Sequence, residues 1–169
     1  MSNELRRKVL FLCTGNSCRS QMAEGLVNHY LRERWVAHSA GTRPSGYVHP
    51  LAVRVMSELG IDLSGQRSKS VEEFRDVDFD RIVTVCDNAA ANCPVWLGQG
   101  RVIHIGFPDP AEATGSEVEK LGVFRQVRDA IRQEVFAHLE KTTSDAEAAA
   151  FKSFDIAFES KAPIIEGDE

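Results

Sequence analysis

The chain has 169 residues, 43% of them hydrophobic, which suits one ordinary domain with a buried core. Its formal net charge of -5 disfavours a broad surface for nucleic acids or anionic membranes, so any anion site should be local. No stretch approaches the roughly 20 apolar residues of a membrane-spanning helix, and the apolar run at 9–13 is too short for an export signal. We therefore expect a cytoplasmic protein without a nucleic-acid or membrane partner.

Four short apolar runs predict β-strands, at residues 8–13, 36–41, 81–86 and 101–106. Between and after them, apolar residues recur at three- and four-residue spacing, which predicts helices at 20–34, 49–59 and 117–141. Strands that are apolar on both faces are typical of a parallel sheet covered by helices on both sides. The sequence thus predicts one α/β domain at residues 1–141.

Residues 142–169 are predicted to be a C-terminal extension. A short amphipathic helix is expected at 146–158, with Phe151, Phe154 and Phe158 on one side, before a polar end of sequence EGDE. The phenylalanines favour docking on the domain over binding of a partner. We assign this extension no function, and the sequence carries no indication of an oligomeric state.

The most informative motif lies between the first predicted strand and the first predicted helix. There Cys13 is followed, six residues later, by Arg19 and then by Ser20. The N–H groups of such a loop, with the positive end of a helix dipole, bind a tetrahedral oxyanion. The predicted oxyanion-binding residues are Thr14, Gly15, Asn16, Ser17, Cys18 and Arg19.

The same electrostatic field stabilises a thiolate, so we expect Cys13 to be a nucleophile at neutral pH. Arg19 can bind two oxygens of the anion, Ser20 can donate a hydrogen bond to the Cys13 sulfur, and Asn16 can fix the shape of the loop. The alternative interpretation is that Cys13 is merely a buried cysteine at the end of a strand.

The string CTGNSCRSQMAEG resembles the phosphate-binding loop of the low-molecular-weight tyrosine phosphatase superfamily, and closely that of its thioredoxin-coupled arsenate reductases. The similarity runs from about residue 8 to residue 141. It implies a flavodoxin-like three-layer fold with a four-stranded parallel sheet. It also implies that Asp109, in GFPDPA, is the general acid for the leaving oxygen, although an aspartate between prolines is by itself a common turn former.

Two further cysteines, Cys86 and Cys93, have six residues between them. Reducing arsenate takes two electrons, which conversion of a dithiol to a disulfide supplies. The resemblance implies that Cys13 attacks arsenate, Cys86 displaces arsenite to form a disulfide with Cys13, and Cys93 then attacks Cys86. Thioredoxin or another dithiol protein would reduce the final disulfide.

The alternative for this pair is a buried strand residue and an incidental cysteine. A zinc site is disfavoured by the loose spacing, so we expect no metal and no cofactor. Cys18 is given no catalytic role.

Some of these reductases hold a potassium ion near the loop, through residues to which Asn16, Glu24 and Ser39 correspond here. The last acidic member is replaced by Lys69. Its ammonium could pair with Glu24 and steady Asn16, so we expect no dependence on potassium. A solvated surface lysine is the ordinary alternative.

Three functions compete. The first is arsenate reduction, the second is hydrolysis of phosphotyrosine or small phosphoesters through a Cys13 phosphoenzyme, and the third is a non-catalytic redox sensor or binding module. The Cys86 and Cys93 pair favours the first over the second, as does the lack of an evident aromatic pair near Asp109. Arg19, Ser20 and Asp109 argue against a sensor, which needs no acid.

Overall fold

The computed structural model describes residues 6–86, 96 and 98–159, with side chains described as far as residue 142. Four parallel strands form one sheet, with β1 and β3 in its centre and the order β2-β1-β3-β4. This order confirms the predicted flavodoxin-like α/β fold. The strands are β1 (Arg7–Cys13), β2 (Trp35–Gly41), β3 (Arg81–Thr84) and β4 (Arg101–His104).

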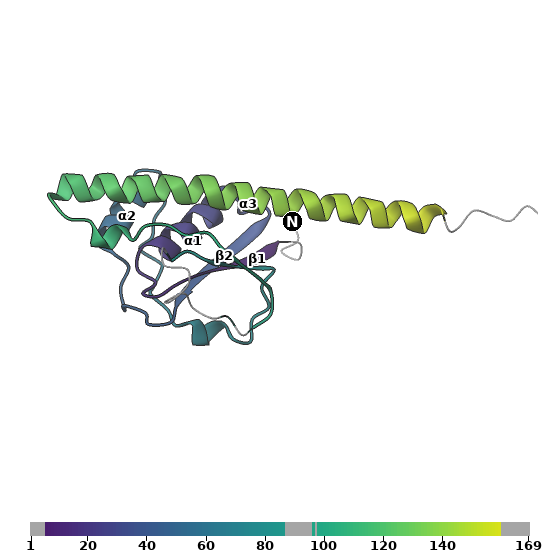
Figure 1. Cartoon of the computed structure of the whole chain (residues 1–169), viewed down its shortest axis with the longest axis horizontal. Helices are drawn as coiled ribbons and strands as arrows, with labels where there is room; N and C mark the ends of the chain where they lie inside the picture. Colours follow the sequence, from purple (N-terminus) through teal and green to yellow (C-terminus); the bar gives the residue numbers. More distant parts are fainter. Residues whose placement is uncertain (1–5, 87–95, 97, 160–169) are drawn as a thin grey trace, which may run out of the picture. The chain divides into compact units, whose positions relative to one another are not determined.

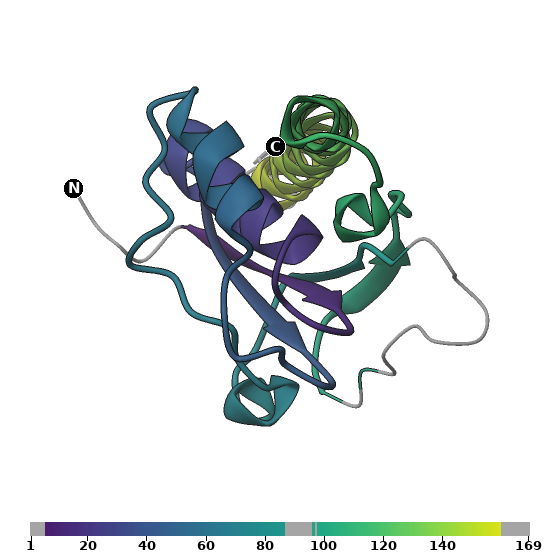
Figure 2. The same ribbon diagram turned by 90° about the vertical axis from the view of Figure 1, so that its left-hand side faces the viewer.

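Two helices follow β1 and β2. Helix α1 (Arg19–Tyr30) begins directly after the Cys13 loop, and α2 (Pro50–Ser57) is preceded by His49, whose Nδ1 accepts the backbone N–H of Leu51 at 3.1 Å. Proline fits the first turn of a helix because its missing N–H would have no partner there. Figure 2 shows α1 and α2 on the same face of the sheet.

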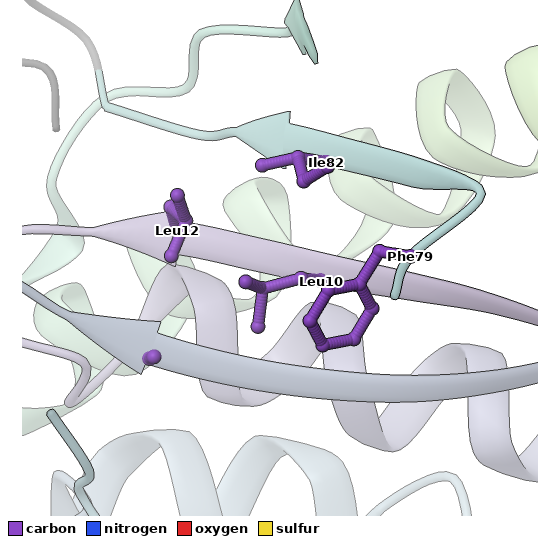
Figure 3. Close-up of a cluster of buried hydrophobic side chains, with 5 residues drawn as sticks. Leu10, Leu12, Phe79 and Ile82 are labelled. Atoms are coloured by element: carbon purple, nitrogen blue, oxygen red, sulfur yellow. The ribbon is translucent and has the colours of Figure 1, made fainter. Parts of the chain in front are cut away.

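On the opposite face of the sheet, the part of the chain that the structure describes carries the short 3₁₀ helix η2 (Val71–Phe74) and the segments that flank it (Figure 2). Leu10 and Leu12 from β1 point to this face together with Ile82 from β3 and Phe79 (Figure 3). Because side chains alternate along a strand, the remaining apolar residues of β1 face α1.

Helix α3 (Glu117–Glu159) is continuous through residues 142–145, where the sequence predicted a break between two helices (Figure 1). One reason is visible at Thr142, whose hydroxyl donates to the carbonyl of His138 at 2.9 Å and so is satisfied inside the helix. The chain divides into two compact units, residues 1–135 and 136–169, and α3 belongs to both. The predicted domain boundary at 141 falls within this helix.

The first part of α3 packs within unit 1 next to α2. Arg128 donates to the carbonyl of Val55 at 2.8 Å, and Arg125 pairs with Glu58 at 2.9 Å. The buried apolar residues of this first part of α3 are Leu121, Phe124, Val127, Ile131 and Val135.

No helix among the described residues is both long and apolar enough to cross a membrane.

Candidate active site

The predicted oxyanion loop lies at the carboxyl end of β1, in the centre of the sheet. Cys13 ends the strand, Arg19 begins α1, and both are buried. Asn16 has a φ of 48°, a left-handed conformation that asparagine tolerates better than most residues. Its backbone N–H donates to the Cys13 sulfur at 3.2 Å. The loop therefore folds back so that the Asn16 N–H points at the sulfur, while binding of an oxyanion stays a prediction.

A chain of hydrogen bonds ends on the Cys13 sulfur, and its direction can be worked out. The backbone N–H of Lys69, which can only donate, bonds the Asn16 side-chain oxygen at 2.8 Å. The amide nitrogen of Asn16 must then face Ser20, and it donates to the hydroxyl oxygen at 2.8 Å.

Ser20 is fully buried, so its hydroxyl hydrogen needs an acceptor. Because the Asn16 amide nitrogen is itself a donor, the acceptor among the hydrogen-bond partners of Ser20 is the Cys13 sulfur, 2.9 Å away. The sulfur thus receives hydrogen bonds from Ser20 and from the Asn16 backbone, which is the pattern that stabilises a thiolate.

Two glutamines that the sequence analysis did not single out support Asn16, one by direct hydrogen bonds and the other through the first. Gln21 is fully buried, and its side-chain nitrogen donates to the Asn16 carbonyl at 3.0 Å and to the Asn16 side-chain oxygen at 2.9 Å. Gln66 in turn donates to the side-chain oxygen of Gln21 at 2.8 Å. Gln21 could have been noticed as an uncharged polar residue beside the motif, whereas no sequence feature marks Gln66.

The segment after β2 braces the outer side of the loop. The backbone N–H groups of Arg43, Ser45 and His49 donate to three loop carbonyls, each at 2.9 Å. Gly41, at the end of β2, allows this close approach, because a Cβ there would lie 2.4 Å from the carbonyl oxygen of Thr14. Glycine at position 41 thus leaves the space that the backbone of the loop occupies.

Asp109 follows β4, whose carboxyl end lies at the same edge of the sheet as the Cys13 loop, and it lies next to Arg19. Its Oδ2 is 3.6 Å from Nη2 of Arg19, whose other terminal nitrogen donates to the carbonyl of Phe107 at 3.1 Å. The Asp109 Oδ1 accepts the backbone N–H of Ala111 at 3.0 Å and so caps the 3₁₀ helix η3 (Pro110–Glu112). One carboxylate therefore caps a turn and also lies beside Arg19 of the oxyanion loop, while its role as the general acid stays a prediction.

A model of the low molecular weight phosphotyrosine protein phosphatase family matches residues 8–148. The chain belongs to this family. It is 45% identical over 130 residues to the arsenate reductase of Halalkalibacterium halodurans, an alignment that covers 77% of this chain and 93% of the relative.

Two solved structures show that the family holds both kinds of protein that the sequence suggested. An arsenate reductase in the phosphate binding state is 36% identical with a TM-score of 0.68, and the match covers 80% of this chain and 98% of that one. The low molecular weight protein tyrosine phosphatase of T. tengcongensis is 26% identical with a TM-score of 0.62, covering 80% and 99%.

The cysteines of this phosphatase family member have different surroundings. Cys86 is 4% exposed and lies two residues after β3, the strand next to β1, while Cys93 lies outside the described residues. Burial raises the pKa of Cys18 to about 12, although the Ser17 hydroxyl lowers it, so Cys18 stays a thiol at neutral pH. Among the described residues, no group of three or more His, Cys, Asp or Glu is arranged to hold a metal ion.

Lys69 is 8% exposed, so the surface-lysine interpretation is wrong. Its ammonium lies 3.5 Å from Oε2 of Glu24, which also accepts a hydrogen bond from the Ser39 hydroxyl. Burial raises the pKa of the Glu24 carboxyl, while the Lys69 charge and the Ser39 hydrogen bond lower it. The predicted pairing of Lys69 with Glu24 is confirmed, and independence from potassium stays a prediction.

Replacing Gly41 with alanine should displace the loop, because the new methyl group meets a backbone oxygen rather than a flexible side chain. We expect Gly41→Ala to weaken binding of inorganic phosphate by at least about tenfold, or about 1.4 kcal/mol, measured by calorimetry. The control is Gly122→Ala in α3, where an added Cβ has no neighbour within 4 Å. Equal phosphate affinity of Gly41→Ala and the wild type would contradict the close-approach argument.

Replacing Lys69 with methionine leaves the Glu24 carboxyl buried without its cation, which raises its pKa further. A carboxyl with a raised pKa in the folded state stabilises that state below its unfolded pKa, and this stabilisation is lost as pH rises through the folded pKa. Lys69→Met should therefore lose stability relative to the wild type from acidic to neutral pH, reaching about 3 kcal/mol. Urea unfolding across this range measures it.

The double variant Lys69→Met/Glu24→Gln is the control, since it has no carboxyl at position 24 that could ionise. The pH dependence of its stability should resemble that of the wild type more closely than the pH dependence of the single variant does. If the single and double variants show the same pH dependence, Glu24 is not the group responsible.

Proposed function

We propose that this protein reduces arsenate to arsenite, with Cys13 as the nucleophile. The observation that carries the proposal is the Cys13 sulfur, which accepts two hydrogen bonds inside a loop whose N–H groups and Arg19 suit a tetrahedral oxyanion. The relatedness to proteins that are named arsenate reductases supports arsenic over phosphorus as the substrate atom.

In the first step the Cys13 thiolate forms a bond to arsenic, and an oxygen leaves as water with a proton from Asp109. Hydroxide is a poor leaving group, so a placed acid is useful, and the carboxyl beside Arg19 adjoins the loop. The Arg19 guanidinium then balances the charge on the remaining oxygens.

In the second step the Cys86 thiolate attacks the Cys13 sulfur. A disulfide forms between the two cysteines, the bond between sulfur and arsenic breaks, and its electron pair stays on arsenic, which leaves as arsenite. The carboxyl ends of neighbouring parallel strands meet at one edge of a sheet, so Cys86 after β3 and Cys13 after β1 belong to the same edge.

In the third step Cys93 attacks Cys86, which releases Cys13 and leaves a disulfide between Cys86 and Cys93. Thioredoxin or a similar dithiol protein then reduces that disulfide by the same exchange chemistry. The role of Cys93 rests on the sequence pattern.

Hydrolysis of phosphoesters is the second candidate, because the oxyanion loop and the acid serve both reactions. The T. tengcongensis phosphatase supports it, as does Tyr47, which is 55% exposed on the segment that braces the loop and could contact an aryl group. Water would then attack the Cys13 phosphoenzyme, and neither Cys86 nor Cys93 would be needed.

The relay predicts different results for two serine variants in a single turnover with excess arsenate. Cys93→Ser should release one equivalent of arsenite and stop, because it can still form the disulfide between Cys13 and Cys86. Cys86→Ser should release none. In steady state with thioredoxin, thioredoxin reductase and NADPH, both variants should lose at least about 100-fold in turnover.

Both variants should keep the wild-type rate with p-nitrophenyl phosphate, which shows that the oxyanion loop is intact. Wild-type protein that releases phosphate from this ester but yields no arsenite, even in a single turnover, would identify a phosphatase instead.

A further inference from the structure

Strand β4, at one of the two edges of the sheet, leaves an accessible surface beside Cys86. It pairs with β3 alone among the described strands, and Arg101, Val102 and His104 are all exposed. Val102 is 47% exposed although it is a large apolar residue in a strand. Edge strands that remain uncovered are prone to pair with other chains, so proteins usually protect them.

This surface is continuous with Cys86. Gly106 follows β4 and has no side chain to separate the two, since a Cβ there would lie 3.0 Å from the Cys86 carbonyl oxygen and 2.9 Å from Nε2 of His104. The His104 ring is held over this position by Thr84, whose hydroxyl is 2.7 Å from Nδ1. Because Cys86 itself is 4% exposed, a protein that exchanges thiols with it has to contact the neighbouring surface.

The amino-terminal end of the exposed strip of β4, Arg101 to His104, is basic, although the chain is acidic overall. Arg101 lies in register with Arg81 on β3, and like charges in facing positions are unfavourable. Burial lowers the pKa of Arg81, the charges of Arg101 and Arg7 lower it further, and the neighbouring Asp80 raises it only in part. The Arg81 Nε is buried without a hydrogen-bond partner among the described residues. An anionic group from outside would relieve this repulsion.

We propose that the exposed strip of β4, Arg101 to His104, docks the dithiol protein that recycles the enzyme. The fitting partner presents an acidic residue to Arg101 and an apolar surface to Val102 while its cysteines reach the disulfide of Cys86. The proposal rests on the proposed arsenate reduction and adds to it the place where the partner binds.

The test compares two electron donors for each variant: reduced thioredoxin with its reductase and NADPH, and dithiothreitol, which is too small to need a docking surface. We expect Val102→Asp and Arg101→Glu each to raise the KM for thioredoxin by about tenfold or more, with turnover by dithiothreitol unchanged. The matched control is Val118→Asp, the same substitution at a valine that is 76% exposed in the first turn of α3. It should leave both donors unaffected.

Equal KM values for thioredoxin in Val102→Asp, Val118→Asp and the wild type would overturn the docking proposal. An equal loss with both donors would also overturn it, because the substitutions would then act through the site itself. A wild-type dimer that Val102→Asp separates, with thioredoxin kinetics unchanged, would show that the strip pairs two copies instead. Wild-type protein that reduces no arsenate with either donor would refute the proposed function as well.

Discussion

The hydrogen bond from the Lys69 backbone to Asn16 sets the direction of the bonds that converge on Cys13. A backbone N–H can only donate, so the Asn16 amide has one orientation, and the Ser20 hydroxyl is left to donate to the sulfur. Reversing that amide would place an acceptor against Ser20 and take its hydrogen away from the sulfur. The Gln21 side chain supports the same orientation. The hydrogen bonds at the proposed nucleophile therefore depend on a residue that is 53 positions from Asn16 in the sequence.

The parallel sheet gathers the chemistry at one edge. Cys13 ends β1, Cys86 follows β3, and Asp109 follows β4, so three neighbouring strands supply the proposed nucleophile, electron donor and acid. The fourth, β2, ends in Gly41, which makes room for the loop. The proposed chemistry proceeds by exchange of bonds among sulfur atoms, so the scaffold has to keep some cysteines reactive and others inert. Cys18 shows the second case, because burial raises its pKa to about 12.

Residues close in sequence were predicted well. The Cys13 loop, its position between strand and helix, and the four strands follow from local pattern, and the place of Asp109 follows from the rule that parallel strands end together. Gln66 was missed because its partner Gln21 is 45 positions away and only the fold brings them together. The break expected at 142 was wrong. The polar Thr142 does not end the helix, because its hydroxyl donates to the backbone carbonyl of His138 in the preceding turn. Cys93, which lies outside the described residues, remains a prediction from the sequence.

The central claim is that the hydrogen bonds directed at the Cys13 sulfur make this cysteine reactive. The rate at which iodoacetamide alkylates Cys13 tests it most directly, in protein whose other three cysteines are replaced by serine. Asn16→Gly suits the left-handed backbone but removes the amide, and we predict that it slows alkylation at neutral pH, as Ser20→Ala should. Equal alkylation rates in Asn16→Gly, Ser20→Ala and the parent protein would contradict the account.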